Sequence, residues 1–399
     1  MHKTGSSSIQ ATMAKMATKD PLYVLPNPAN NSVPLAAIFE ENPRGLFKHR
    51  SKRQDPEYTS KIIEQWKNSI DETLSSCNAR SVVFSAEYLS VASHEAIERM
   101  RDYLSRYCSS IQIIGYVRPP VPWINSAFQQ RSKNRAVNNF QELITLRDYR
   151  KVFEKFDKIF GVENVSLVVF DRKTLKGNDV VLDFAHRIGF PLNHEDVVQA
   201  NESMSLEAVS LLYAKRFFGS PMNWENPNSA KAYARFLDKL RGLGKRKVSL
   251  AESLVAPLLA DHQDDIDWME QRVGASLRGE TDFAADAIGG EEDLIAVALS
   301  SARLLDEIEP GLAPRDPTLE SVTAALDKLY GICLAQVGGA TRDDTIVTSF
   351  ARALEQTYGA TSPNHTEGRG ASYVDLSRSI MNDLRKQGFV VRAKQMSTD

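Results

Sequence analysis

Short apolar runs and amphipathic stretches alternate along the first half of the chain. Three runs that end abruptly in polar residues predict buried strands at residues 82–84, 111–117 and 165–170. Apolar residues at helical spacing predict helices at residues 8–16, 57–75, 93–107, 146–160 and 180–188. Residues 20–56 are broken by Pro, Asn and Gly, which predicts a loop-rich stretch with short pieces. Strands that alternate with helices predict an α/β fold, a parallel sheet with helices on both faces.

The pattern changes after about residue 274. Four further helices are predicted there, at residues 291–307, 318–336, 344–358 and 373–387, and no cluster of reactive residues accompanies them. The sequence therefore predicts two parts, an α/β domain over residues 1–274 and a helical extension over residues 275–399. The extension is expected to pack on the sheet or to mediate assembly, with a homo-oligomer as one form of the latter.

Composition and charge narrow the class of protein. Of 399 residues, 42% are hydrophobic and 25% are charged, and the formal net charge is -2, which argues against a general nucleic-acid binder. Cys77, Cys108 and Cys333 are scattered, which is typical of a reducing compartment and of neither a disulfide framework nor a zinc site. No apolar run approaches a membrane span and no signal peptide is visible, so a soluble cytoplasmic protein is expected.

The first candidate site is the opening stretch HKTGSSS. Gly5 permits a tight turn, and a helix that starts near Ser7 would direct its first N–H groups and the hydroxyls of Ser6 and Ser8 at an anion. Lys3 adds a positive charge beside that turn. The stretch is not a Walker A loop, because its lysine precedes the glycine. On its own, a terminal stretch of this composition is more often a disordered tail.

The second candidate site is the stretch YVRPPVPWINSAF. Arg118 follows a predicted buried strand, and Ser126 comes eight residues later, one turn into a helix that begins near Pro122. A guanidinium and a hydroxyl could then converge on one phosphate. The alternative is a proline-rich turn between strand and helix with an incidental arginine.

Two weaker signals accompany these stretches. Glu87 in FSAEYL comes just after a predicted strand, where a carboxylate can serve as a general base, although most such glutamates are surface residues or start a helix. The basic, glycine-containing stretch at residues 241–249 could cover a nucleotide, although basic loops are usually only solvated.

Taken together, these motifs resemble the sulfotransferases that use 3′-phosphoadenosine 5′-phosphosulfate (PAPS). Lys3, Gly5, Ser6 and Ser7 match that family's loop P-K-[ST]-G-[ST]-[ST], and Arg118 with Ser126 match its second signature in order and spacing. The stretches FDRKTL, where the family more often has YEDL, and NESMSLEA resemble later segments. The resemblance covers roughly residues 1 to 270.

The resemblance implies a P-loop-like sulfotransferase fold and transfer of a sulfuryl group from PAPS to an acceptor hydroxyl, with a carbohydrate or glycolipid as the candidate acceptor and no metal. Lys3 would stabilise the departing phosphate oxygen, as positively charged groups do in phosphoryl transfer. Arg118 and Ser126 would hold the 3′-phosphate, while Glu87, or alternatively His94, would act as the base. The 5′-phosphosulfate would be held by the opening loop, that is by Lys3, Thr4, Gly5, Ser6, Ser7 and Ser8.

One departure from the family leaves alternatives open. The family's loop follows a central strand, whereas only Met1 and His2 precede Lys3 here. The sequence therefore raises the expectation of about six to ten further apolar, β-branched residues before His2 in the natural chain. The alternatives are a catalytically impaired sulfotransferase-like protein that serves as a binding or scaffold module and, less favoured without a Walker A lysine, a P-loop kinase.

Overall fold

The strands of the protein form two small parallel sheets. The computed structural model describes residues 4–16, 20–24, 31–47, 55–134, 136–200, 203–224, 226, 228–278, 283–284 and 286–337. In this part of the chain, β1 (Leu22–Tyr23) pairs with β2 (Val82–Val83), and β3 (Ile113–Val117) pairs with β4 (Val165–Val169). The three predicted strands are confirmed as β2, β3 and β4, each slightly shorter than expected. The strand β1 was not predicted, because two residues carry no detectable period.

Side chains of the strands point alternately into two apolar clusters. On β3, Ile113 packs against one cluster, whereas Ile114 and Tyr116 belong to the other. On β4, Leu167 packs against the first cluster and Val168 against the second. Helices α2, α3, α4 and α6 contribute to the first cluster, and α1 and α7 to the second. The described residues therefore form an α/β structure in which helices cover both faces of the strands.

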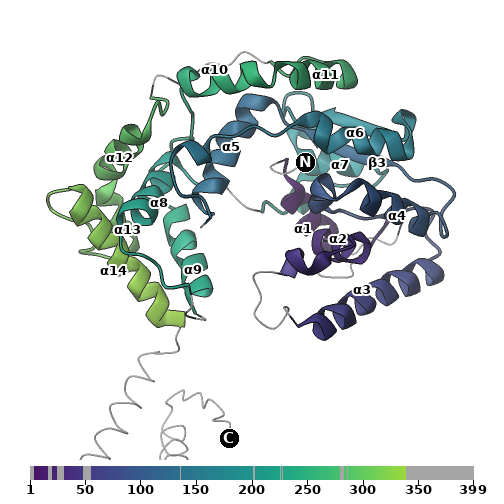
Figure 1. The fold of residues 1–399 in the computed structure, drawn as a ribbon, viewed down its shortest axis with the longest axis horizontal. Coiled ribbons are helices and arrows are strands. Elements are labelled where there is room, and N and C mark those ends of the chain that lie inside the picture. Colours follow the sequence, from purple (N-terminus) through teal and green to yellow (C-terminus); the bar gives the residue numbers. More distant parts are fainter. Residues whose placement is uncertain are drawn as a thin grey trace, which may run out of the picture. The chain divides into compact units, whose positions relative to one another are not determined.

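The helices of this α/β part are labelled in Figure 1. They are α1 (Ser6–Met16), α2 (Ser32–Phe39), α3 (Pro56–Ser76), α4 (His94–Leu104), α5 (Pro120–Ser132), α6 (Tyr149–Phe160) and α7 (Val180–Arg187). The helices predicted from periodicity are confirmed as α1, α3, α4, α6 and α7. The expected short pieces in residues 20–56 include α2, which is almost wholly apolar and so has no polar face to signal a helix.

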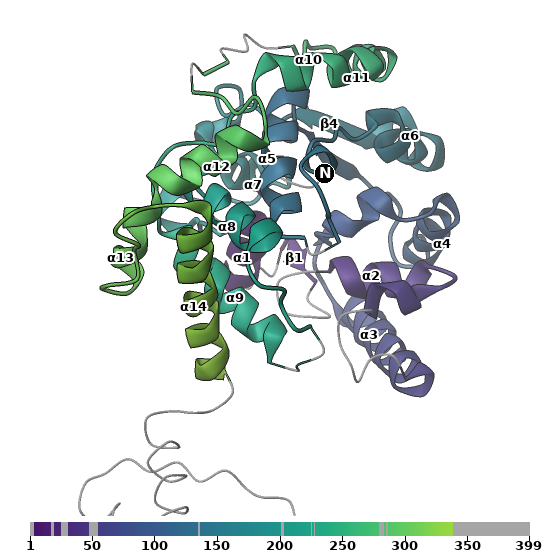
Figure 2. The same cartoon turned by 60° about the vertical axis from the view of Figure 1, so that its left-hand side comes forward.

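The chain continues almost entirely as helices. These are α8 (Leu206–Phe218), α9 (Ser229–Arg241), α10 (Glu252–Asp261), α11 (Gln263–Val273), α12 (Glu291–Ser300), α13 (Leu305–Ile308) and α14 (Leu319–Val337). Helix α12 packs against α8, as Figure 2 shows. The predicted helix at 291–307 is present as α12 with α13, and that at 318–336 as α14. The helices predicted at 344–358 and 373–387 lie outside the described residues.

Short 3-10 helices connect these elements. They are η1 (Pro43–Phe47), η3 (Glu87–Val91), η4 (Gln141–Leu143), η5 (Val162–Asn164), η6 (Lys176–Asn178), η7 (His194–Asp196) and η8 (Ala302–Leu304). Of these, η3 carries the candidate base Glu87 and follows β2 closely. Within the ranges that the structure describes, no helix is both long and apolar enough to cross a membrane.

The chain divides into two compact units. One comprises Met1–Ser220 with Lys239–Ala325, and the other comprises Pro221–Asp238 with Leu326–Asp399. In the first unit, Leu250 and Ile288 form an isolated parallel bridge, which joins a residue beyond position 274 to the preceding segment. In the second unit, the rings of Phe236 and Tyr330 meet edge to face at 6.1 Å. The domain boundary predicted after residue 274 stays a prediction.

Candidate functional site

The candidate nucleotide loop leads directly into helix α1. Gly5 has φ +76°, a conformation that L side chains rarely adopt, and a Cβ atom at this position would overlap Val180 Cγ1. The Gly5 carbonyl accepts hydrogen bonds from the N–H groups of Ser8 (3.0 Å) and Ile9 (3.1 Å) and so starts the helix. The backbone therefore requires glycine for two reasons. Thr4 is buried beside this turn, and Lys3 lies outside the described residues.

The serine hydroxyls of the loop have different partners. Ser6 Oγ donates a short hydrogen bond to Glu87 Oε2, although 81 residues separate the two in sequence. Ser8 Oγ accepts from the N–H of Ala200 at 3.0 Å and lies 3.3 Å from its carbonyl, which ties α1 to the segment before α8. Ser7 is half-buried. The structure thus brings Ser6 to Glu87, while the hydroxyl of Ser8 is engaged by the backbone.

A second contact fixes α1 against the end of β2. Gln10 Nε2 donates to both the carbonyl and the hydroxyl of Ser85, each at 3.3 Å. Gln10 is buried, one turn along α1 from Ser6, and Ser85 comes two residues before Glu87. Two side chains of α1 therefore hold the segment that carries the candidate base.

Arg118 begins the connection from β3 to α5. Its Cζ atom lies 5.6 Å from the centre of the Phe170 ring, within range of a cation–π contact. Burial lowers the pKa of Arg118 to about 10, and the nearby guanidinium of Arg172 acts in the same direction. The hydroxyl of Tyr149, at the start of α6, donates to the carbonyl of Arg118 at 2.6 Å and fixes the strand end. Arg118 is thus a partly desolvated cation on a rigid support.

The two halves of the predicted nucleotide site meet at Phe170. An ideal Cβ on Gly5 would lie 4.0 Å from Phe170 Cε2, while Arg118 lies over the same ring. The Phe170 N–H donates to the carbonyl of Val117 at 2.7 Å, which extends the pairing of β3 and β4 by one residue. The start of α1 and the end of β3 therefore flank one aromatic side chain. The sequence predicted Phe170 only as the last residue of a buried strand, because an apolar side chain at a strand end does not by itself indicate a site residue.

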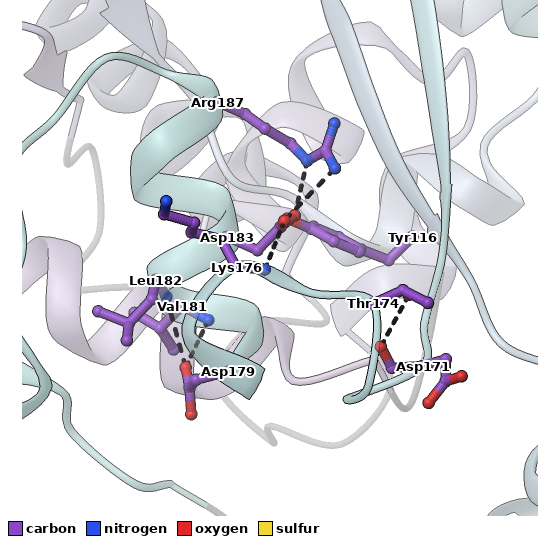
Figure 3. Close-up of polar contacts among 9 residues, drawn as sticks. All are labelled: Tyr116, Asp171, Thr174, Lys176, Asp179, Val181, Leu182, Asp183 and Arg187. Carbon is purple, nitrogen blue, oxygen red and sulfur yellow. Dashed lines mark hydrogen bonds and ion pairs between the residues drawn. The ribbon is translucent and has the colours of Figure 1, made fainter.

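Helix α7 supports the glycine turn, and a buried polar network anchors it (Figure 3). Asp183 accepts from the hydroxyl of Tyr116 on β3 at 2.7 Å, from the N–H of Lys176 at 3.1 Å and from Arg187 Nε at 2.6 Å. Burial alone would raise the pKa of Asp183, but hydrogen bonds from Arg187, Tyr116 and the Lys176 backbone together lower it. The position of Val180 against Gly5 is therefore set by contacts to β3.

The structure also describes the surroundings of Ser126, His94 and the basic stretch at 241–249. Ser126 is half-buried on α5, which begins at Pro120, two residues earlier than expected. His94 is the first residue of α4, and its Nε2 atom lies 3.7 Å from Oε1 of Glu98. In the basic stretch at 241–249, Arg246 Nε donates to Glu207 Oε1 at 2.8 Å, so one of its cations is engaged by a carboxylate.

The arrangement can bind oxyanions and accept a proton. The first N–H groups of α1 and the guanidinium of Arg118 favour negative charge, and Glu87 is the carboxylate that the structure brings to the loop. Among the described residues, no group of three or more His, Cys, Asp or Glu side chains could hold a metal ion.

Comparisons with known proteins give no relative from which a role could be transferred. The sequence matches no protein-family model, and neither the curated proteins nor the solved structures include a significant match.

Proposed function

We propose that the protein is a PAPS-dependent sulfotransferase that acts on an acceptor hydroxyl. The observation that carries the proposal is the meeting of three separate segments. The turn at Gly5 and the strand end at Arg118 flank the Phe170 ring, and Ser6 in the first segment binds Glu87 in the third. Two sites for oxyanions and a carboxylate are the groups that this chemistry needs.

Each group has a distinct role in the proposal. PAPS, when bound, supplies the sulfuryl group. The turn at Gly5 and the N–H groups at the start of α1 would hold the 5′-phosphosulfate, with Lys3 as the cation beside it. Arg118 would hold the 3′-phosphate, with Ser126 as its predicted partner. Glu87 would accept the proton of the acceptor hydroxyl, and its hydrogen bond from Ser6 keeps the carboxylate at the loop.

The fit to this nucleotide rests on the glycine turn and on the charge of Arg118. A Cβ atom at position 5 would overlap Val180 Cγ1, so only glycine fits this turn. Burial of Arg118 removes part of its hydration, which strengthens its interaction with an anion. A guanidinium beyond the 5′-phosphate site is the feature that would distinguish a 3′-phosphorylated adenosine from ATP.

Thermal unfolding with added nucleotide tests this proposal. Addition of 3′,5′-ADP, the product nucleotide, should raise the Tm by about 5 °C at roughly 100 times its Kd. Adenosine 5′-monophosphate, which lacks the 3′-phosphate, should give a much smaller shift at the same concentration. An unchanged Tm with 3′,5′-ADP would contradict the proposal and favour a scaffold role. Displacement of 3′,5′-ADP by ATP with Mg²⁺ would favour a kinase.

A further inference from the structure

Two cations meet at one residue of the turn that carries Glu87. Ser90 is buried in η3, three residues after Glu87. Arg147 Nη1 lies 3.4 Å from the hydroxyl of Ser90, and Lys155 Nζ donates to the carbonyls of Ser90 at 3.2 Å and Ala92 at 2.6 Å. Both side chains reach this turn from more than fifty residues further along the chain.

The charges around this turn are already partly engaged. Two carboxylates are near enough to influence the cations: Glu87 favours the charged form of Arg147, and Glu40 favours that of Lys155. Glu87 accepts a hydrogen bond from the hydroxyl of Ser6. Glu40 Oε1 accepts from the N–H of Ser93 and Glu40 Oε2 from its hydroxyl, each at 2.9 Å.

The two cations differ in how well they are satisfied. Lys155 donates to two carbonyls and so fastens the end of η3. The guanidinium of Arg147 offers five N–H donors, yet its one hydrogen bond among the described residues is the long contact to Ser90, and no carboxylate in that part of the chain lies within 4.0 Å. Burial also lowers the pKa of Arg147. A half-buried guanidinium with spare donors is well suited to bind an oxyanion that reaches it from solvent.

We propose that Arg147 binds an oxyanion of the acceptor, so that the acceptor of this enzyme is an acidic molecule. The proposal rests on the proposed function, because it assigns the acceptor to the turn of Glu87. Arg147 contacts the same short turn as the candidate base, so an acceptor held by its acidic group would present a neighbouring hydroxyl to Glu87. Carboxylate, sulfate and phosphate groups share this chemistry.

Binding of matched sugars tests the proposal. Galacturonate, glucose 6-sulfate, glucose 6-phosphate and glucose would each be titrated against the full-length protein by ligand-observed NMR, with and without saturating 3′,5′-ADP. Saturation with nucleotide blocks its own phosphate sites. At least one acidic sugar should bind about tenfold more tightly than glucose, and the best of the three identifies the anionic group.

Variants assign that preference to Arg147. The substitution Arg147→Gln should abolish the preference for acidic sugars, and Arg147→Lys should keep part of it, since it retains a charge. Arg150→Gln is the matched control, because Arg150 is an exposed arginine of the same segment, whose guanidinium lies 5.3 Å from the Trp268 ring. Equal binding of acidic and neutral sugars by the wild type, or an undiminished preference in Arg147→Gln, would overturn the proposal. Acidic-sugar binding without any 3′,5′-ADP binding would retain the anion site and overturn the proposed function instead.

Discussion

At the scale of single residues, the candidate site and the neighbouring turn η3 involve groups in unusual surroundings. Gly5 has a positive φ and no space for a side chain, Arg118 is partly desolvated, and Lys155 is a half-buried ammonium group that donates to two carbonyls. Desolvation of the two cations carries a cost in stability that an ordinary surface residue would not. Such costs are common where a protein positions groups for binding or chemistry.

Lys155 gives a prediction about pH. Burial lowers its pKa to about 8, helped by Arg147, whereas an unfolded lysine titrates near 10.4. Between these values the unfolded chain holds a proton that the folded chain has lost, so stability contributed by this residue rises with pH. The penalty for burying the charged form is complete below pH 8 and disappears towards pH 10.4.

Removal of Lys155 should therefore change the pH profile of stability. The free energy of unfolding of the wild type, relative to Lys155→Met, should increase by about 1 to 2 kcal/mol from pH 7 to pH 10, less than the full shift in pKa corresponds to, because solvent screens the half-buried ammonium group. Urea unfolding at half-unit steps of pH measures this difference. Lys158→Met is the control, because Lys158 is an exposed residue of the same helix, paired with Glu154. A difference that stays flat over this range would show that Lys155 does not carry the predicted pKa.

At the scale of elements, the start of α1 depends on how α7 is held. Val180 of α7 fills the space beside Gly5, and the network of Tyr116, Asp183 and Arg187 anchors α7 to β3. Asp179 adds the helix cap, since its Oδ1 accepts from the N–H of Val181 at 2.7 Å. The geometry of the loop is thus determined by contacts behind it.

The substitution Tyr116→Phe tests that support. It removes one hydrogen bond to a buried carboxylate and leaves the packing of the ring intact, so the free energy of unfolding should fall by about 1.5 to 3 kcal/mol. Guanidinium unfolding gives the value. Tyr58→Phe on α3 is the matched control, because Tyr58 is exposed, and it should change stability by less than about 0.5 kcal/mol. Equal effects of the two substitutions would mean that the network does not stabilise α7.

At the scale of the whole molecule, local pattern predicted the elements that carry a short apolar run or a single apolar face. The strands β2, β3 and β4 were recognised as short apolar runs that end in polar residues, and helices such as α6 because their apolar residues recur at helical spacing. Helix α8 was not, since every residue from Leu206 to Lys215 is buried and no polar stripe marks a helix. The α/β class could be predicted because the sequence pattern indicates the order of the strands and helices.

The candidate site was only partly accessible to sequence reasoning. Gly5, Glu87 and Arg118 could be selected because each occupies a marked place, a glycine turn or a strand end. The contacts that join them could not, because Ser6 and Glu87 are 81 residues apart and Arg147 and Ser90 are 57 apart. Convergence over such separations depends on the packing of whole elements, which residue patterns do not encode.

The measurement that tests the central claim most directly is the isothermal titration of two nucleotides against wild type and Arg118→Gln. The wild type should bind 3′,5′-ADP about 100-fold more tightly than adenosine 5′-monophosphate, because a guanidinium–phosphate pair contributes close to 3 kcal/mol. In Arg118→Gln, the ratio of the two affinities should fall below about ten, and the affinity for adenosine 5′-monophosphate should stay unchanged. An undiminished ratio in Arg118→Gln, or no binding of either nucleotide by the wild type, would contradict the claim that the Gly5 turn and Arg118 form one nucleotide site.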